Sequence, residues 1–152
     1  MNVIGFIICI LVSSACYRVG GSDLNIPLKS KIRDWGVPAC GVFAMFMLHV
    51  NAPWYIHLIY FFLAWGSLVT YWDHWGDDNV QWYEWLLTGF MYSMSTLPYA
   101  IYSGHWIAFG VHAVVLTGLF MAVRCGSKNV YVEECGSGAI YIISKLAFLI
   151  KG

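Results

Sequence analysis

Charged residues are confined to three short stretches of this chain, and pairs of long apolar runs separate one stretch from the next. The stretches cover residues 18–36, 73–84 and 124–134, and they contain all eight acidic residues and six of the eight basic ones. The connections at 49–53 and 103–105 contain no Asp, Glu, Lys or Arg. If each apolar run forms a helix that crosses a bilayer, the three charged stretches emerge on the same side. The pattern therefore predicts a one-sided molecule whose functional groups lie at its charged side.

The chain is too apolar for an ordinary soluble domain. Of its 152 residues, 60% are hydrophobic and 11% are charged, whereas soluble domains average about 45–50% and about 25%. We therefore expect residues 1–152 to form a single integral membrane domain surrounded by the lipid bilayer. The formal net charge of +0 argues against a nucleic-acid partner, because proteins that bind nucleic acids carry a strongly basic face.

Six apolar runs predict an all-α fold, a polytopic transmembrane helix bundle of five to six helices. A membrane-crossing helix needs roughly 20 residues, and the third, fourth and fifth runs reach that length with their flanks. The second run is short and the sixth contains Lys145, so these two are the candidates for short or half-inserted helices. The first run resembles a signal peptide without a basic leader, and we expect it to remain as a transmembrane helix. The runs are 2–17, 37–50, 54–72, 85–102, 106–123 and 139–150.

The distribution of Lys and Arg in short loops indicates which side of a membrane protein faces the cytoplasm. The first and third charged stretches hold six of the eight basic residues. We therefore expect all three charged stretches to be cytoplasmic and the N-terminus to lie outside.

Asp73 and Asp77 form the first candidate site. If the third helix continues through them, their spacing of four residues places both carboxylates on one face. Such a pair can bind Mg²⁺ or Mn²⁺, with water and a phosphate group completing the octahedron. Asp73 and Asp77 are therefore candidate metal ligands and candidate catalytic residues. The structural alternative is that they pair with Arg18, Arg33 or Arg124 at the membrane interface.

A second group of residues is suited to an anion. Arginine side chains can clamp a phosphate, and the Gly136-Ser137-Gly138 sequence would offer backbone N–H groups at the expected start of the sixth helix. Glu134 lies next to this sequence and is a candidate catalytic general base. Alternatively, the glycines only begin a helix, the arginines extend to the interface, and Glu134 neutralises a nearby basic residue. The candidate substrate-binding residues are Arg18, Arg33, Arg124 and Ser137.

Polar residues inside the apolar runs form a third feature. His112 lies in the middle of the fifth run, where burial without a partner is costly, so it is a functional hypothesis by default. If it is neutral and hydrogen-bonded to a neighbouring helix, its role is purely structural. Together with Ser93, Ser95 and Thr96 on the fourth run, it gives only a broken polar stripe, which argues against a continuous pore.

Several short motifs occur in a fixed order along the chain: YRVGGS at 17–22, RDWGVP at 33–38, WD at 72–73, GDDN at 76–79 and GSGA at 136–139. With these motifs the chain loosely resembles small polytopic membrane proteins of tailed bacteriophages. The resemblance covers most of the chain and implies a bacteriophage protein in a bacterial inner membrane. It implies no particular activity.

Two functions follow from these patterns. The first is a membrane-interface enzyme, or a binding protein, for a phosphate-bearing or lipid-linked ligand, with a divalent cation and arginines stabilising the anionic group. The second is a non-catalytic phage-type membrane protein, such as a pore, a lysis or exclusion factor, or a small transporter. Its charges would then form interhelical or intersubunit salt bridges, the latter in a homo-oligomer.

Overall fold

The computed structural model describes residues 1–21, 25, 27–75, 81–126 and 129–150, without the side chains of residues 71–75 and Val130. Within these residues the fold is entirely helical, which confirms the predicted all-α class. The elements are α1 (Val3–Val19), α2 (Lys29–Met47), α3 (Trp54–Trp75), α4 (Trp82–Met94), α5 (Leu97–Ser103), α6 (Trp106–Gly126), α7 (Val130–Ile143) and the 3-10 helix η1 (Ser144–Leu149).

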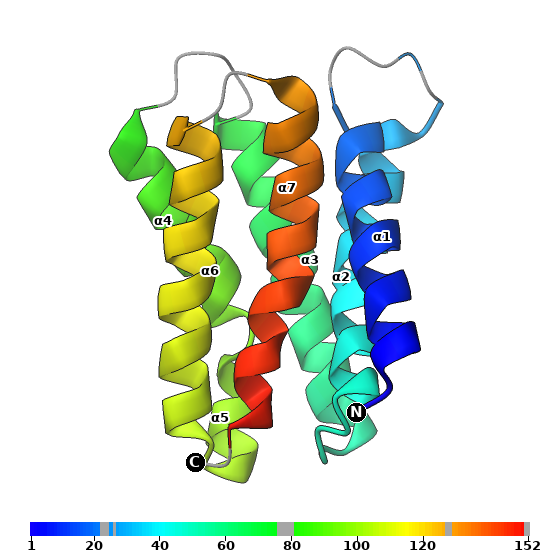
Figure 1. The fold of residues 1–152 in the computed structure, drawn as a ribbon, viewed down its shortest axis with the longest axis vertical. Helices are drawn as coiled ribbons and strands as arrows, with labels where there is room; N and C mark the ends of the chain where they lie inside the picture. Colours follow the sequence, from blue (N-terminus) through cyan, green and yellow to red (C-terminus); the bar gives the residue numbers. More distant parts are fainter. Residues whose placement is uncertain (22–24, 26, 76–80, 127–128, 151–152) are drawn as a thin grey trace.

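The long helices run up and down beside one another in a bundle (Figure 1). The ends of α1, α3 and α6 and the beginnings of α2, α4 and α7 all lie at the upper end in Figure 1. These helix ends border the three charged stretches of the sequence. We call this the charged end of the bundle, because it carries Arg18, Arg33, Arg124, Glu133 and Glu134, and the opposite end the uncharged end.

Two of the expected helices are not regular along their length. The fourth apolar run is divided into α4 and α5, and Ser95 and Thr96 lie between them. Pro98 follows in the first turn of α5, where a residue without an N–H group is tolerated. The sixth run begins as α7 and tightens at Ser144 into η1. The helix that contains the second run begins earlier than expected, because α2 starts at Lys29 and continues through Pro38.

Close contact between α1 and α7 depends on a glycine. A Cβ atom at Gly138 would lie 2.6 Å from the carbonyl oxygen of Ser13 and 2.8 Å from the Cα of Ser14. Because Gly138 has no side chain, the two backbones approach closely enough for the Ser13 hydroxyl to donate to the Gly138 carbonyl oxygen at 2.8 Å. Small residues serve this purpose in helix pairs that pack tightly.

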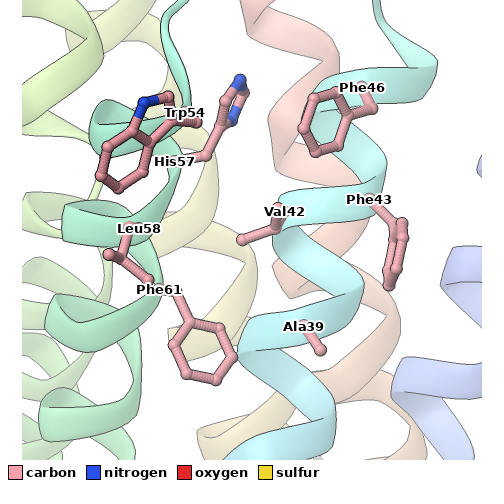
Figure 2. Close-up of a pocket in the computed structure, with 8 residues that line it drawn as sticks. All are labelled: Ala39, Val42, Phe43, Phe46, Trp54, His57, Leu58 and Phe61. Carbon is pink, nitrogen blue, oxygen red and sulfur yellow. The ribbon is translucent and has the colours of Figure 1, made fainter.

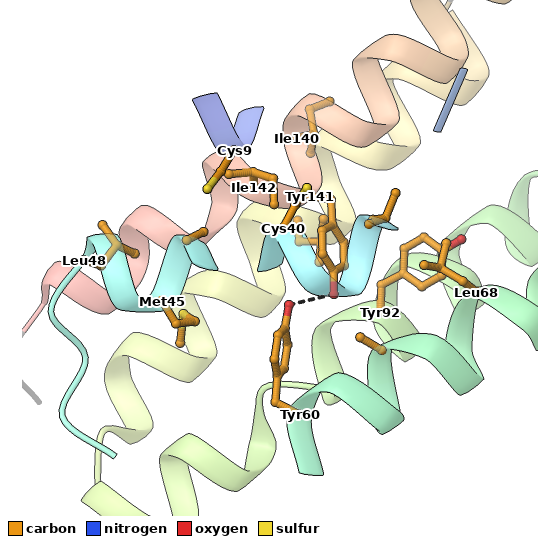
Figure 3. Packing of buried hydrophobic residues seen from close by; sticks show 14 of the residues in the cluster. Cys9, Cys40, Met45, Leu48, Tyr60, Leu68, Tyr92, Ile140, Tyr141 and Ile142 are labelled. Atoms are coloured by element: carbon orange, nitrogen blue, oxygen red, sulfur yellow. Dashed lines mark hydrogen bonds between the residues drawn. The ribbon is translucent and has the colours of Figure 1, made fainter. Parts of the chain in front are cut away.

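Tyrosines fill much of the centre of the bundle (Figure 3). Tyr60 of α3 and Tyr141 of α7 point toward each other, and their hydroxyl oxygens are 2.7 Å apart. Tyr92 of α4 lies edge-on to Tyr141, with ring centroids 6.2 Å apart. Tyrosine can fill an interior only where its hydroxyl finds a partner, so these rings join hydrophobic packing to a polar network.

The outer surface of the bundle is apolar along α1, α3 and α6. Ile4 and Val114 are each 74% exposed, and Leu11 is 64% exposed. By length and composition, α6 alone among the described helices could cross a membrane, with a mean hydropathy of 2.0; α1 and the Trp54–Thr70 part of α3 are apolar but shorter. One candidate span is thus present among the described helices, and a total of five to six crossing helices stays a prediction.

Candidate functional site

At the charged end, Arg18 is joined to Glu134. The Arg18 Nη1 atom is 3.3 Å from Glu134 Oε2, and both side chains are largely buried between α1 and α7. The Arg18 guanidinium also lies over the ring of Tyr131, 4.5 Å from its centroid. Arg18, a predicted substrate-binding residue, therefore contacts Glu134, the predicted general base.

Arg33 fastens the start of α2 to the end of α1. Its Nε donates to Asp34 Oδ1 at 2.8 Å, and its Nη1 donates to the carbonyl oxygen of Gly20 at 3.1 Å. The side chain is buried. These contacts hold the guanidinium inside the protein.

Arg124, at the end of α6, is surrounded by aromatic rings. Its guanidinium carbon is 5.1 Å from the centroid of Trp85, 5.6 Å from that of Phe120 and 5.7 Å from that of Tyr17. Its Nη1 is 4.0 Å from Glu133 Oε2. Cation–π contacts of this kind are stabilising when the pair is desolvated.

Ser137 does not lie at a helix start. Helix α7 begins at Val130, so Gly136, Ser137 and Gly138 lie within it and their backbone groups take part in the helix. The Ser137 hydroxyl donates to the carbonyl oxygen of Glu133 in the preceding turn. The turn expected there is absent, because the helix extends through the glycines and uses them for close packing instead.

The side chains of Asp73 and Asp77 lie outside the described residues, and Asp73 is placed only as part of α3. Among the side chains that are described, no group of three or more His, Cys, Asp and Glu residues could hold a metal ion. Binding of Mg²⁺ or Mn²⁺ therefore stays a prediction.

A second polar site lies inside the bundle, away from the charged end. Lys145 Nζ is 3.0 Å from His112 Nε2, and His112 Nδ1 is 3.3 Å from Thr96 Oγ1. All three residues are fully buried. We call Thr96, His112 and Lys145 the buried polar centre. Among the described residues, no carboxylate forms an ion pair with Lys145.

The hydrogen bonds of this centre have a single consistent direction. The Thr96 hydroxyl donates to the carbonyl oxygen of Ser93 at 2.8 Å, so its oxygen accepts from the N–H at His112 Nδ1. His112 Nε2 then carries a lone pair, which accepts a hydrogen bond from Lys145 Nζ. The Thr96 hydroxyl, both His112 ring nitrogens and Lys145 Nζ thus each have a partner, as a buried polar network requires.

Aromatic rings complete the surroundings of Lys145. Its Nζ lies 4.0 Å from the ring centroid of Tyr141 and 5.5 Å from that of Tyr60. The electron-rich faces of these rings attract an ammonium group. The Lys145 side chain is therefore held by His112 of α6, by the Tyr60 ring of α3 and by the Tyr141 ring of α7.

The helix irregularities occur where this centre forms. Thr96 lies at the break between α4 and α5, and Lys145 lies in the first turn of η1, directly after α7 ends. Both breaks are buried, and the hydroxyls of Ser95 and Ser144 each donate to a carbonyl oxygen three residues earlier. Serine and threonine hydroxyls can thus supply bonds where a helix ends inside a bundle.

The sequence pointed to only one part of this centre. The sequence predicts that burial of His112 is costly without a partner, whereas Lys145 indicates only that the sixth run is a candidate for a short or half-inserted helix. The two residues are 33 positions apart, and nothing in their local patterns indicates that they meet. A lysine and a histidine placed singly in different apolar runs are the signal that could have suggested the pair.

The fold and its two sites define a class: a helix bundle with polar groups buried in an apolar core, an apolar outer surface and charges at one end. Comparisons of the chain with protein-family models, with curated proteins and with solved structures found no match.

Proposed function

We propose that this chain is a polytopic integral membrane protein that binds and passes protons at the Lys145–His112 pair. The observation that carries the proposal is the 3.0 Å contact between two fully buried basic side chains. It belongs to the second class of function inferred from the sequence, the small transporter.

The distribution of apolar side chains supports placement in a bilayer. Soluble monomers rarely expose contiguous apolar patches of more than a few hundred Å². Here large apolar side chains are exposed on α1, α2, α3, α4 and α6, while serine, threonine, histidine and lysine are buried among the apolar side chains of the core. An apolar exterior around a core that also contains polar groups suits lipid as the surrounding solvent.

Aromatic residues at the two ends support the same placement. Trp54 and Trp106 are exposed at the uncharged end, and Trp82 and Tyr131 are exposed at the charged end. Tryptophan and tyrosine favour the two membrane–water interfaces. In this proposal α1, α2, α3, α4 with α5, α6, and α7 with η1 form six crossing segments, and the charged end faces the cytoplasm of a bacterial cell.

The chemistry of the pair suits proton transfer. One proton can be held in two arrangements, as a Lys145 ammonium donating to a neutral imidazole or as a His112 imidazolium donating to an amine. Ionisable residues inside membrane proteins typically mark proton or ion pathways. His112 is the seventh residue of α6, roughly 9 Å from its start at about 1.5 Å per residue, so the pair lies nearer the uncharged end.

Helix breaks at the pair support a transport role. Discontinuous helices form the ion and substrate sites of many transporters, because their broken ends supply polar groups inside the membrane. Thr96 and Lys145 come from two such breaks and meet at His112 on α6, which continues past them unbroken.

Proton flux through the purified protein tests the proposal. The protein is reconstituted into liposomes of phosphatidylethanolamine and phosphatidylglycerol, a potassium diffusion potential is imposed, and internal pH is followed with entrapped pyranine. We expect flux above that of protein-free liposomes, and its loss in Lys145→Met and in His112→Gln. Lys31→Met and His105→Gln are the matched controls, since Lys31 is exposed and His105 lies outside the centre.

Each outcome of this experiment decides the proposal. Flux lost only in the two centre variants, both folded as judged by circular dichroism, supports it. Wild-type liposomes that behave like protein-free ones, or flux that persists in both centre variants, would overturn it.

A further inference from the structure

A second histidine is buried near the uncharged end of the bundle. His57 is the fourth residue of α3 and is 5% exposed. Figure 2 shows its ring between Trp54 and Phe46, beside an apolar groove that separates α2 from α3. The groove exposes no polar atom, so both ring nitrogens of His57 are turned toward the protein. An ionisable side chain inside a membrane protein is a functional candidate by default.

The two ring nitrogens of His57 have different neighbours. Nδ1 is 2.7 Å from the hydroxyl oxygen of Tyr99, a residue that is 1% exposed. Nε2 lies beside the carbonyl oxygen of Ala52, in the connection at the uncharged end. Asn51, the preceding residue, is exposed. His57 therefore lies between a buried hydroxyl group and a surface connection.

The short helix α5 brings Tyr99 close to the buried polar centre. Thr96 directly precedes α5, and its hydroxyl oxygen is 3.3 Å from Nδ1 of His112. The backbone N–H of Tyr99 donates to the carbonyl oxygen of Thr96 at 3.1 Å. One turn of chain thus carries two side chains that each meet a histidine, Thr96 at the centre and Tyr99 at His57. The start of α5 therefore connects the two buried histidines.

Two rings lie between Tyr99 and the Lys145–His112 pair. The centroid of Tyr60 is 5.5 Å from that of Tyr99 and 5.5 Å from Lys145 Nζ. The centroid of Phe148 is 6.0 Å from that of Tyr99 and 5.5 Å from that of His112. These contacts place Tyr99 one ring away from each member of the pair, and on its uncharged-end side.

We propose that His57 and Tyr99 pass protons between the uncharged end and the buried polar centre. This role depends on the proton transfer by Lys145 and His112 proposed above. When the Tyr99 hydroxyl receives a proton from the centre, it gives its own proton to His57 Nδ1, and Nε2 releases one beside Ala52. One proton enters and one leaves, Tyr99 stays neutral, and His57 returns to its first tautomer before the next passage. A water molecule between the Tyr99 hydroxyl and the centre completes the path, because buried water commonly bridges polar groups.

Proton flux into the liposomes described above tests this role in His57→Gln and Tyr99→Phe. Glutamine keeps a hydrogen-bond donor and an acceptor but does not take up a proton, and phenylalanine removes only the hydroxyl group. We expect each variant to lose flux by about a hundredfold, the lower end of what a positioned proton-transfer group contributes. His105→Gln is the matched control, because His105 lies at the same end of the bundle outside this path, and it should carry wild-type flux.

A second measurement separates proton transfer from a structural role. The coupling between Lys145 and His112, obtained from the unfolding of Lys145→Met, His112→Phe and the double variant, should be the same with His57→Gln added as without it. Flux lost in both path variants, with this coupling retained, supports the inference. Wild-type flux in either path variant, or a coupling lost together with the flux, would overturn it.

The flux measurement also distinguishes this inference from the proposed function. Flux that is lost in Lys145→Met and kept in His57→Gln and Tyr99→Phe would overturn the path and leave the proposed function standing. A wild-type protein that carries no flux would overturn both.

Discussion

Lys145 and His112, two basic residues, are joined by a hydrogen bond of 3.0 Å between Lys145 Nζ and His112 Nε2. Neither residue is exposed, so water does not compete for their nitrogens. Lys145 is placed by the first turn of η1 and His112 by the second turn of α6. The hydrogen bond therefore depends on how α6 and η1 are rotated and shifted relative to each other.

A double-mutant cycle on this pair should show strong coupling. Lys145→Met or His112→Phe alone leaves a buried polar group without its partner, which costs about 1–3 kcal/mol. The double variant replaces both polar groups with apolar ones and should be closer to the wild type than the sum of the single variants. Unfolding of the purified protein in detergent by circular dichroism measures the effect. Additive losses would contradict a direct interaction.

Gly138→Ala should destabilise the contact between α1 and α7. The new methyl group would lie 2.6 Å from the Ser13 carbonyl oxygen, and the backbone there cannot move aside without separating the helices. We expect a loss of about 1–3 kcal/mol, typical of overpacking, as measured by thermal unfolding. Gly118→Ala is the control, because a Cβ at Gly118 meets open space and alanine favours a helix by about 0.5–1 kcal/mol. Equal stability of the two variants would refute the close approach.

Gly41→Ala should disturb the Tyr60–Tyr141 hydrogen bond. A Cβ at Gly41 would clash with the Tyr60 hydroxyl, which is 2.7 Å from the Tyr141 hydroxyl. The loss of stability should be partly reversed by adding Tyr60→Phe, because that change removes the clashing oxygen. Thermal unfolding of both single variants and of the double variant measures the rescue. If Tyr60→Phe only adds to the damage, the hydroxyl is not what opposes the alanine.

Cysteine labelling should locate the charged end. Cys125 is exposed at the end of α6, and Asn51 is exposed in the connection at the uncharged end. In a variant whose other four cysteines are alanine, Cys125 should react with a membrane-impermeant maleimide in inside-out vesicles and not in right-side-out ones. Asn51→Cys, in the same background with Cys125→Ala, should show the reverse. Identical labelling of both sites from one side would exclude the proposed topology.

Binding of Mn²⁺ tests the metal site predicted from the sequence. If Asp73 and Asp77 share a divalent cation, the wild type should bind Mn²⁺ in an electron paramagnetic resonance titration, and Asp77→Asn should lose that binding. Asp34→Asn is the control, because Asp34 is already engaged by Arg33. Wild-type protein that leaves all Mn²⁺ free would refute the metal hypothesis, and so would unchanged binding in Asp77→Asn.

The candidate site at the charged end shows how far sequence reasoning reaches. The sequence predicts that Arg18 and Arg33 bind a substrate and that Glu134 is a general base, and these roles stay predictions. Their partners were not predictable, since Arg18 contacts Glu134 from a distant segment and Arg33 donates to the Gly20 backbone. The local sequence indicates that a charged side chain is costly to bury, but it does not indicate which distant group will be its hydrogen-bond or ion-pair partner.

The sequence by itself determined the helical class, the approximate bounds of the apolar segments and the gathering of charged helix ends at one end of the bundle. Each of these follows from the hydropathy and charge of neighbouring residues. Only the tertiary structure decided that Lys145 meets His112, that Tyr60 meets Tyr141, and that Gly136–Gly138 lie inside α7. These depend on helix rotation, on breaks such as that at Ser95–Thr96, and on close packing at small residues. Such packing depends on two helix surfaces that are distant in the sequence and meet only in the folded protein. It therefore cannot be predicted from either helix alone.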